Sequence, residues 1–138
     1  MEKNSDLFQL AQRGADAGDP LSTSNLAYCY LFGVGVVKNE ARAVELYQRA
    51  IALGSAQAIK NLGGCYFRGS GVAQDYSEAV RLFKQAAELG NPYALNRLGN
   101  CYSNGEGVAK DVARARSLYE EAAALGHQLA KRNLAALG

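Results

Sequence analysis

The sequence lacks the features that mark a membrane-spanning or exported chain. It contains no run of about 18 apolar residues, so no transmembrane helix and no membrane partner are expected. The N-terminal stretch, MEKNSDLFQL, shows neither the basic region nor the apolar block of a signal peptide. We therefore expect a cytoplasmic protein, or a periplasmic or secreted one if a leader peptide has been removed.

Motifs of catalysis and of nucleotide binding are also absent. The sequence has no G-K-[ST] phosphate loop, no S-x-x-K and no G-x-S-x-G. The single histidine, His127, follows a glycine, and no catalytic partner is evident beside it. A net charge of +2 is too small to indicate nucleic-acid binding by itself. We predict that the protein is not an enzyme and holds no cofactor.

What the sequence does contain is an internal repeat. A step of 36 residues separates the members of a leucine, a cysteine, a tyrosine and a glycine column: Leu26, Leu62, Leu98 and Leu134; Cys29, Cys65 and Cys101; Tyr30, Tyr66 and Tyr102; Gly33, Gly69 and Gly105. A fixed period of roughly 20 to 50 residues is typical of a solenoid, in which each unit packs against its neighbours. The composition, 49% hydrophobic and 20% charged, is that of a soluble globular protein.

Each repeat predicts a helical hairpin. The first helices, here called A helices, are expected at 20–32, 56–68, 92–104 and from 128 onward, with their leucine, cysteine and tyrosine columns on one buried stripe. The second helices, called B helices, are expected at 40–53, 76–89 and 112–125. A G-x-G-V loop joins the two, and its glycines allow positive φ. Asn39, Asp75 and Asp111 are expected to cap the B helices.

Residues 5–17 match only the B half of the repeat, so the chain opens in mid-unit. This is either a natural N-terminal cap or the point at which a longer array has been cut. The predicted organisation is one domain with a half-repeat at 1–19, repeats at 20–55, 56–91 and 92–127, and a C-terminal capping helix at 128–138.

The cysteines are expected to be small buried side chains. Equivalent atoms in stacked helices lie about 10 Å apart, whereas a disulfide needs Cα atoms within about 7 Å. No C-x-x-C pair and no neighbouring histidine are present, which argues against a metal site. The tyrosine column is assigned wholly to the core. Gly63 and Gly99 lie inside A helices, and we expect each to permit close contact with the paired helix.

The repeated residues resemble the Sel-one-like repeat family, a relative of the tetratricopeptide repeat. They occur in the second repeat as Ala58, Leu62, Gly63, Tyr66, Gly69, Gly71, Val72, Asp75, Ala79, Phe83, Ala86, Ala87 and Gly90. The resemblance implies an all-α fold, an alpha-alpha superhelix (solenoid) of antiparallel hairpins with about three full repeats plus terminal half-repeats. It also implies a protein-protein interaction scaffold or adaptor. The paired cysteines of one branch of the family would fall at Ala87 and Leu95, so those disulfides are absent here.

Charge is sorted between the helices. None of the 13 acidic residues falls in the four A segments, which contain Lys60, Arg68, Arg97, Lys131 and Arg132. In stacked hairpins the A helices line the concave face, and a cleft of one sign attracts the opposite charge. We predict that this groove binds an acidic or C-terminal peptide, with the apolar side chains of the peptide toward the first unit and its carboxylate toward the last.

By analogy with tetratricopeptide hairpins, the partner-binding residues are expected to be Tyr28, Phe32, Lys60, Asn61, Phe67, Arg68, Tyr93, Asn96, Arg97, Asn100, Arg132 and Asn133. Structural alternatives stay open: the asparagines at 25, 61 and 133 bond to backbone, or the basic residues form a solvated face. Two other functions also stay open. One is self-assembly through the C-terminal helix, where Leu134 and Leu137 lack a B partner, giving a monomer with weak self-association. The other is RNA binding, which the modest charge disfavours.

Overall fold

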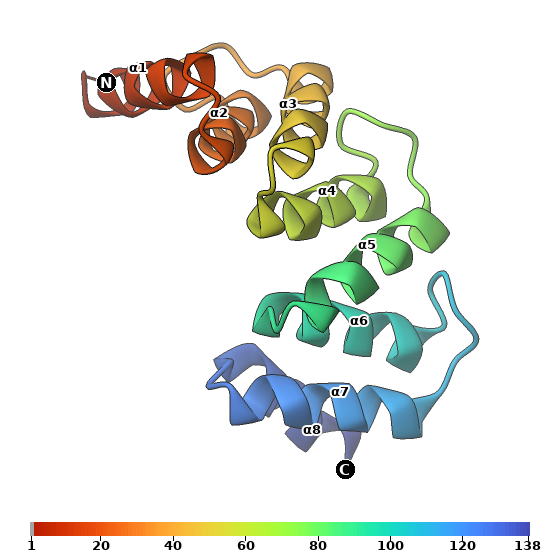
Figure 1. The fold of residues 1–138 in the computed structure, drawn as a ribbon. Helices are drawn as coiled ribbons and strands as arrows, with labels where there is room; N and C mark the ends of the chain where they lie inside the picture. Colours follow the sequence, from red (N-terminus) through yellow and green to blue (C-terminus); the bar gives the residue numbers. More distant parts are fainter. Residues whose placement is uncertain (1) are drawn as a thin grey trace. The chain divides into compact units, whose positions relative to one another are not determined.

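The computed structural model describes residues 2–138, and this range folds into eight α-helices without a strand (Figure 1). The helices are α1 (Glu2–Asp16), α2 (Pro20–Phe32), α3 (Glu40–Ala52), α4 (Ala56–Arg68), α5 (Tyr76–Glu88), α6 (Pro92–Asn104), α7 (Val112–Ala124) and α8 (Gln128–Leu137). They form two compact units, the first ending at Gln74 with α1–α4 and the second spanning Asp75–Gly138 with α5–α8.

The predicted helix positions are confirmed to within a few residues. The A helices are α2, α4, α6 and α8, and the first three have the predicted bounds. The B helices α3, α5 and α7 each end one residue earlier than predicted, because Leu53, Leu89 and Leu125 serve as C-caps. The half-repeat helix α1 begins at Glu2 rather than residue 5.

Side-chain caps fix where the helices begin. Asn39 accepts a hydrogen bond from the backbone N–H of Arg42 at 3.0 Å, and Asp75 and Asp111 cap α5 and α7 in the same way. These three caps were predicted. The A helices α2, α4 and α6 are capped as well, by Asp19, Ser55 and Asn91. Each such cap stabilises its helix by about 1 kcal/mol.

Within each unit, every helix packs on its neighbours in the chain. In unit 1, α2 packs against α1 and α3 and also touches α4, which packs on α3. In unit 2, α6 packs against α5 and α7, and α7 packs on α8. The largest fully buried side chains include Leu26, Leu46 and Tyr47 in unit 1 and Phe83 in unit 2. The A and B helices of a hairpin therefore share one apolar core.

Two glycines in unit 2 permit close contacts. A Cβ atom at Gly99 would lie 2.6 Å from Cε1 of Tyr119, which confirms the predicted close approach of an A helix to its own B helix. Gly107 has a φ of 75°, and a Cβ there would lie 2.4 Å from the backbone oxygen of Tyr76. The loop after α6 therefore presses its backbone onto the first turn of α5.

The three cysteines are buried, as predicted. The tyrosines of the neighbouring column were predicted to lie wholly in the core, and they are less buried than that. Cys29, Cys65 and Cys101 are buried and free. The tyrosines of the neighbouring column are only half-buried. Tyr30 meets the ring of Phe8 edge to face at 5.7 Å. A phenol hydroxyl is costly to bury without a partner, so these rings stay at the edge of the core.

Candidate functional site

The A helices of unit 1 carry an exposed aromatic pair. Tyr28 and Phe32 lie one turn apart on α2, with 51% and 56% of their surfaces exposed. Their ring centroids are 4.7 Å apart, so the two rings form one apolar patch. Aromatic side chains exposed in this way are common anchors for protein partners.

Basic side chains lie on α4 of the same unit. Lys60 is half-buried, and burial lowers the pKa of its ammonium group. Arg68 is exposed and folds back along α4, so that its Nη1 lies 3.1 Å from where a Cβ of Gly64 would stand. Asn61 and Phe67 are half-buried. The absence of a side chain at Gly64 thus leaves room for the guanidinium of Arg68.

Unit 2 holds a cation between two rings. The Cζ atom of Arg97 lies 5.5 Å from the ring centroid of Phe83 and 5.9 Å from that of Tyr93. Both distances are within the range of cation–π attraction. Tyr93 also meets the ring of His127 edge to face at 6.2 Å. Arg97 is therefore held in place, half-buried, at the junction of α5 and α6, while Arg132 on α8 is exposed.

The predicted asparagines of unit 2 form a network with one another. Nδ2 of Asn133 donates to Oδ1 of Asn96 at 2.9 Å and lies 3.4 Å from Oδ1 of Asn100. Tyr119 donates its hydroxyl hydrogen to Asn100 at 2.5 Å. Asn96 has no exposed surface, so its side chain is unavailable to a partner, and the prediction for this residue needs correction. The partners of Asn133 are side chains rather than the backbone.

Three ion pairs lie on B helices and on the loop before α3. Lys38 pairs with Glu40 at 3.9 Å and Arg42 with Glu45 at 3.2 Å, and Arg81 pairs with Glu78. They belong to α3, to α5 and to the loop that leads into α3. Three acidic side chains of the B helices, Glu40, Glu45 and Glu78, thus pair locally.

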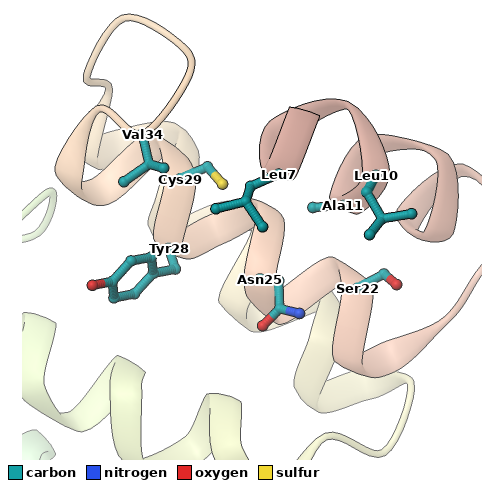
Figure 2. A pocket seen from close by; sticks show the side chains of 8 residues that line it. All are labelled: Leu7, Leu10, Ala11, Ser22, Asn25, Tyr28, Cys29 and Val34. Atoms are coloured by element: carbon teal, nitrogen blue, oxygen red, sulfur yellow. The ribbon is translucent and has the colours of Figure 1, made fainter. Parts of the chain in front are cut away.

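Sequence reasoning missed a cavity between α1 and α2 (Figure 2). It has a volume of about 250 Å³ and a mainly apolar lining: Leu7, Leu10, Ala11, Ser22, Asn25, Tyr28, Cys29 and Val34. The signal for it was the presence of leucine at 7 and 10 in a helix that has no predicted A partner. Of the predicted site residues, only Tyr28 lines this cavity.

The repeats match a known family profile. Residues 20–55, 56–91 and 92–127 each match the profile described as Sel1 repeat. The chain belongs to the Sel1 repeat family. Sel1 repeats are generally protein-protein interaction scaffolds without enzymatic activity. No curated protein matches the chain significantly.

Solved structures of Sel1 repeat proteins are similar to this one. The Sel1 repeat protein from Oxalobacter formigenes has 32% identity and a TM-score of 0.87, covering 95% of this chain and 54% of its own. A protective antigen of uropathogenic Escherichia coli with an SLR fold has 36% identity and a TM-score of 0.82, covering 87% of this chain and 26% of its own. This Sel1 repeat chain thus spans about half the length of the Oxalobacter formigenes protein and about a quarter of the length of the Escherichia coli antigen.

A third structure shares the fold alone. Helicobacter pylori cysteine rich protein B has 21% identity and a TM-score of 0.72, over 96% of this chain and 95% of its own.

Across residues 2–138 of the present Sel1 repeat protein, no group of three or more His, Cys, Asp or Glu side chains is arranged to hold a metal ion. No helix in the same range is long and apolar enough to span a bilayer.

Proposed function

We propose that the A helices of this Sel1 repeat protein bind an acidic segment of a partner protein. One observation carries the proposal: α2, α4, α6 and α8 contain none of the 13 acidic residues, yet they contain five cations. These are Lys60, Arg68, Arg97, Lys131 and Arg132. Within each unit, A helices that carry only cations attract and orient a ligand of the opposite sign.

Unit 2 offers the contacts for a carboxylate. Arg97 is held over the rings of Phe83 and Tyr93, so little conformational entropy is lost when its guanidinium receives a ligand. Arg132 is exposed on α8. A planar guanidinium can donate two hydrogen bonds to one carboxylate, whether this is an acidic side chain or a chain terminus.

Unit 1 offers the contacts for apolar side chains. Tyr28 and Phe32 together present an aromatic patch, and Lys60 and Arg68 lie on the other A helix of the unit. Burial already lowers the pKa of Lys60, so a bound carboxylate would stabilise the charged form of this lysine. The preferred ligand of unit 1 therefore combines an aromatic or aliphatic residue with a carboxylate.

The test is a binding titration with a fluorescent peptide that carries one aromatic residue and a Glu-rich C-terminus. Arg132→Ala is compared with Lys84→Ala, because both substitutions remove one exposed cation, from α8 and from the B helix α5 respectively. We expect Arg132→Ala to weaken binding roughly tenfold and Lys84→Ala to have little effect, as a charge-assisted hydrogen bond contributes about 1.5–3 kcal/mol.

A second substitution separates the two parts of the proposal. Tyr28→Ala is expected to weaken binding of the peptide that has the aromatic residue and to leave binding of an all-acidic peptide unchanged. Equal losses from Arg132→Ala and Lys84→Ala would show that net charge alone drives binding and would contradict the proposal.

A further inference from the structure

Helices α5, α6 and α7 of unit 2 form a groove that lies apart from the residues of the proposed acidic-ligand site. Its volume is about 340 Å³, which is in the range of small-ligand sites. The groove is lined by side chains of all three helices: Lys84, Ala87, Glu88, Leu95, Leu98, Tyr102, Arg114, Leu118 and Glu121. All of them lie between positions 84 and 121, so the groove depends on neither end of the chain.

The floor of this groove is apolar. It consists of Leu95, Leu98 and Leu118, each at most 5% exposed, and of the half-buried ring of Tyr102. The leucines also belong to the core that α6 and α7 share, so the floor is a fixed part of the fold. Such a surface favours apolar side chains as ligands, because their burial releases water.

The rim of the groove carries four exposed charged side chains, which are sorted by sign. Along α5, Lys84 precedes Glu88 by one turn. Along α7, Arg114 precedes Glu121 by two turns. Both helices are antiparallel to α6, so they run in the same direction (Figure 1). The two cations therefore lie toward one end of the groove and the two carboxylates toward the other.

Arg114 fixes the cationic end of the groove. Its Cζ atom lies 5.8 Å from the ring centroid of Tyr102, within the range of cation–π attraction. Glu121 is seven residues further along α7, which is roughly 10 Å along the helix axis. Across residues 2–138, none of the four charged side chains of the rim takes part in an ion pair. Both ends of the groove therefore keep their charge for a ligand.

We infer that this groove binds a short peptide with free ends and apolar side chains. The carboxylate terminus of the peptide lies near Lys84 and Arg114, and its ammonium terminus lies near Glu88 and Glu121. The apolar side chains rest on the leucines of the floor. An extended chain of three residues spans about 10 Å, which matches the separation of the two charged ends. The best ligand is therefore a tripeptide.

This site is independent of the acidic ligand proposed above. The rim carries two charges of each sign, so the groove attracts a zwitterion rather than an anion. A Glu-rich segment would meet repulsion from Glu88 and Glu121. Failure of either proposal would leave the other standing.

The test is a titration of the isotope-labelled full chain with trileucine at pH 6.5, where both ends of the peptide are charged. The methyl resonances of Leu98 and Leu118 report on the floor of the groove, and those of Leu46 in unit 1 are the control. We expect a Kd on the order of 1 mM, as suits so small a ligand. N-acetylated trileucine lacks the ammonium group and trileucine amide lacks the carboxylate, and each is expected to bind about threefold more weakly.

Two substitutions separate the ends of the groove. Glu121→Gln is expected to reduce the preference for a free N-terminus and to leave the preference for a free C-terminus unchanged, while Arg114→Gln is expected to do the reverse. Glu120→Gln is the matched control, because Glu120 is exposed on α7 outside the groove lining. It is expected to bind all three peptides like the unaltered chain.

Three results would overturn the inference. One is that about 10 mM trileucine leaves the methyl resonances of Leu98 and Leu118 in place. Another is that the three peptides bind equally well, which would mean that the charged rim plays no part. The third is that Glu120→Gln changes the binding of the peptides as much as Glu121→Gln does.

Discussion

The side-chain amide of Asn133 donates a hydrogen bond to Oδ1 of Asn96, which has no exposed surface, over 2.9 Å. The bond joins α8 directly to α6, although the two helices are separated by α7 in the chain. Its neighbour Asn100 accepts a hydrogen bond from Tyr119 on α7. Nδ2 of Asn96 itself has no hydrogen-bond partner among the described residues. The partly buried network still favours this packing of the three helices, because a shifted arrangement would break the hydrogen bonds of Asn133 and Tyr119.

Asn96→Ala is expected to lower the free energy of unfolding by about 1–3 kcal/mol, since the amide of Asn133 loses its acceptor in a partly buried site. Asn25→Ala is the matched control, because Asn25 is exposed in the same column as Asn133 and its loss should change stability by less than about 0.5 kcal/mol. Urea unfolding measures both. Equal effects from the two substitutions would mean that the network contributes nothing beyond the local helix.

Two glycines inside A helices are expected to respond in opposite ways to alanine. Gly99→Ala forces a methyl group against the ring of Tyr119, and we expect a loss of about 1–3 kcal/mol. Gly64→Ala meets only the flexible end of Arg68, so the higher helix propensity of alanine should stabilise the protein by up to about 1 kcal/mol. Thermal unfolding distinguishes the two. The prediction fails if both substitutions destabilise the protein alike.

The buried thiols are expected to make the protein less stable at alkaline pH. Burial raises the pKa of Cys65 and of Cys101 to about 11, from an ordinary thiol value of 9.0. Between these values the folded protein keeps protons that the unfolded chain releases, so the free energy of unfolding falls as the pH rises from about 9 to about 11. Below pH 9 the contribution is fully present.

The same burial should protect the thiols from modification. At pH 8, an aromatic disulfide reagent is expected to react with the native cysteines only after unfolding, because the thiolate is the reactive species. Ser117→Cys, at an exposed position of α7, is the control and should react at the rate of a free thiol. Rapid reaction of all native thiols in folded protein would contradict the burial described here.

The repeat period was sufficient to predict most of the fold. A leucine, a cysteine and a tyrosine at helical spacing, followed by paired glycines and a capping Asn or Asp, place each hairpin to within a residue or two. The same reasoning could not place Asn96. A column of the repeat shows which residues are equivalent, yet it does not show whether a polar side chain faces solvent or a neighbouring helix. In this column Ser24 and Asn96 are buried while Arg132 is exposed.

The candidate site was predicted only in outline. The basic residues of the A helices follow from the sequence alone, whereas the position of Arg97 over Phe83 and Tyr93 depends on how α5 and α6 pack. The aromatic pair on α2 was foreseen as two separate residues, because contact between them depends on their rotamers. The cavity beside α1 was missed, since Leu10 differs from Leu46, Leu82 and Leu118 of its column only in its exposure, which the sequence does not show.

The G-x-G loop that follows an A helix and the short turn that follows a B helix differ in how many inserted residues they can accept. Gly107 presses against the start of α5, and Gly71 lies as close to Glu40 at the start of α3. A Cβ atom at Gly54, Gly90 or Gly126, by contrast, would have no neighbouring atom within 4 Å. Peptide tags or whole domains grafted beside Gly54 or Gly126 should therefore be accommodated, while lengthening a G-x-G loop would wedge it away from the helix on which it rests.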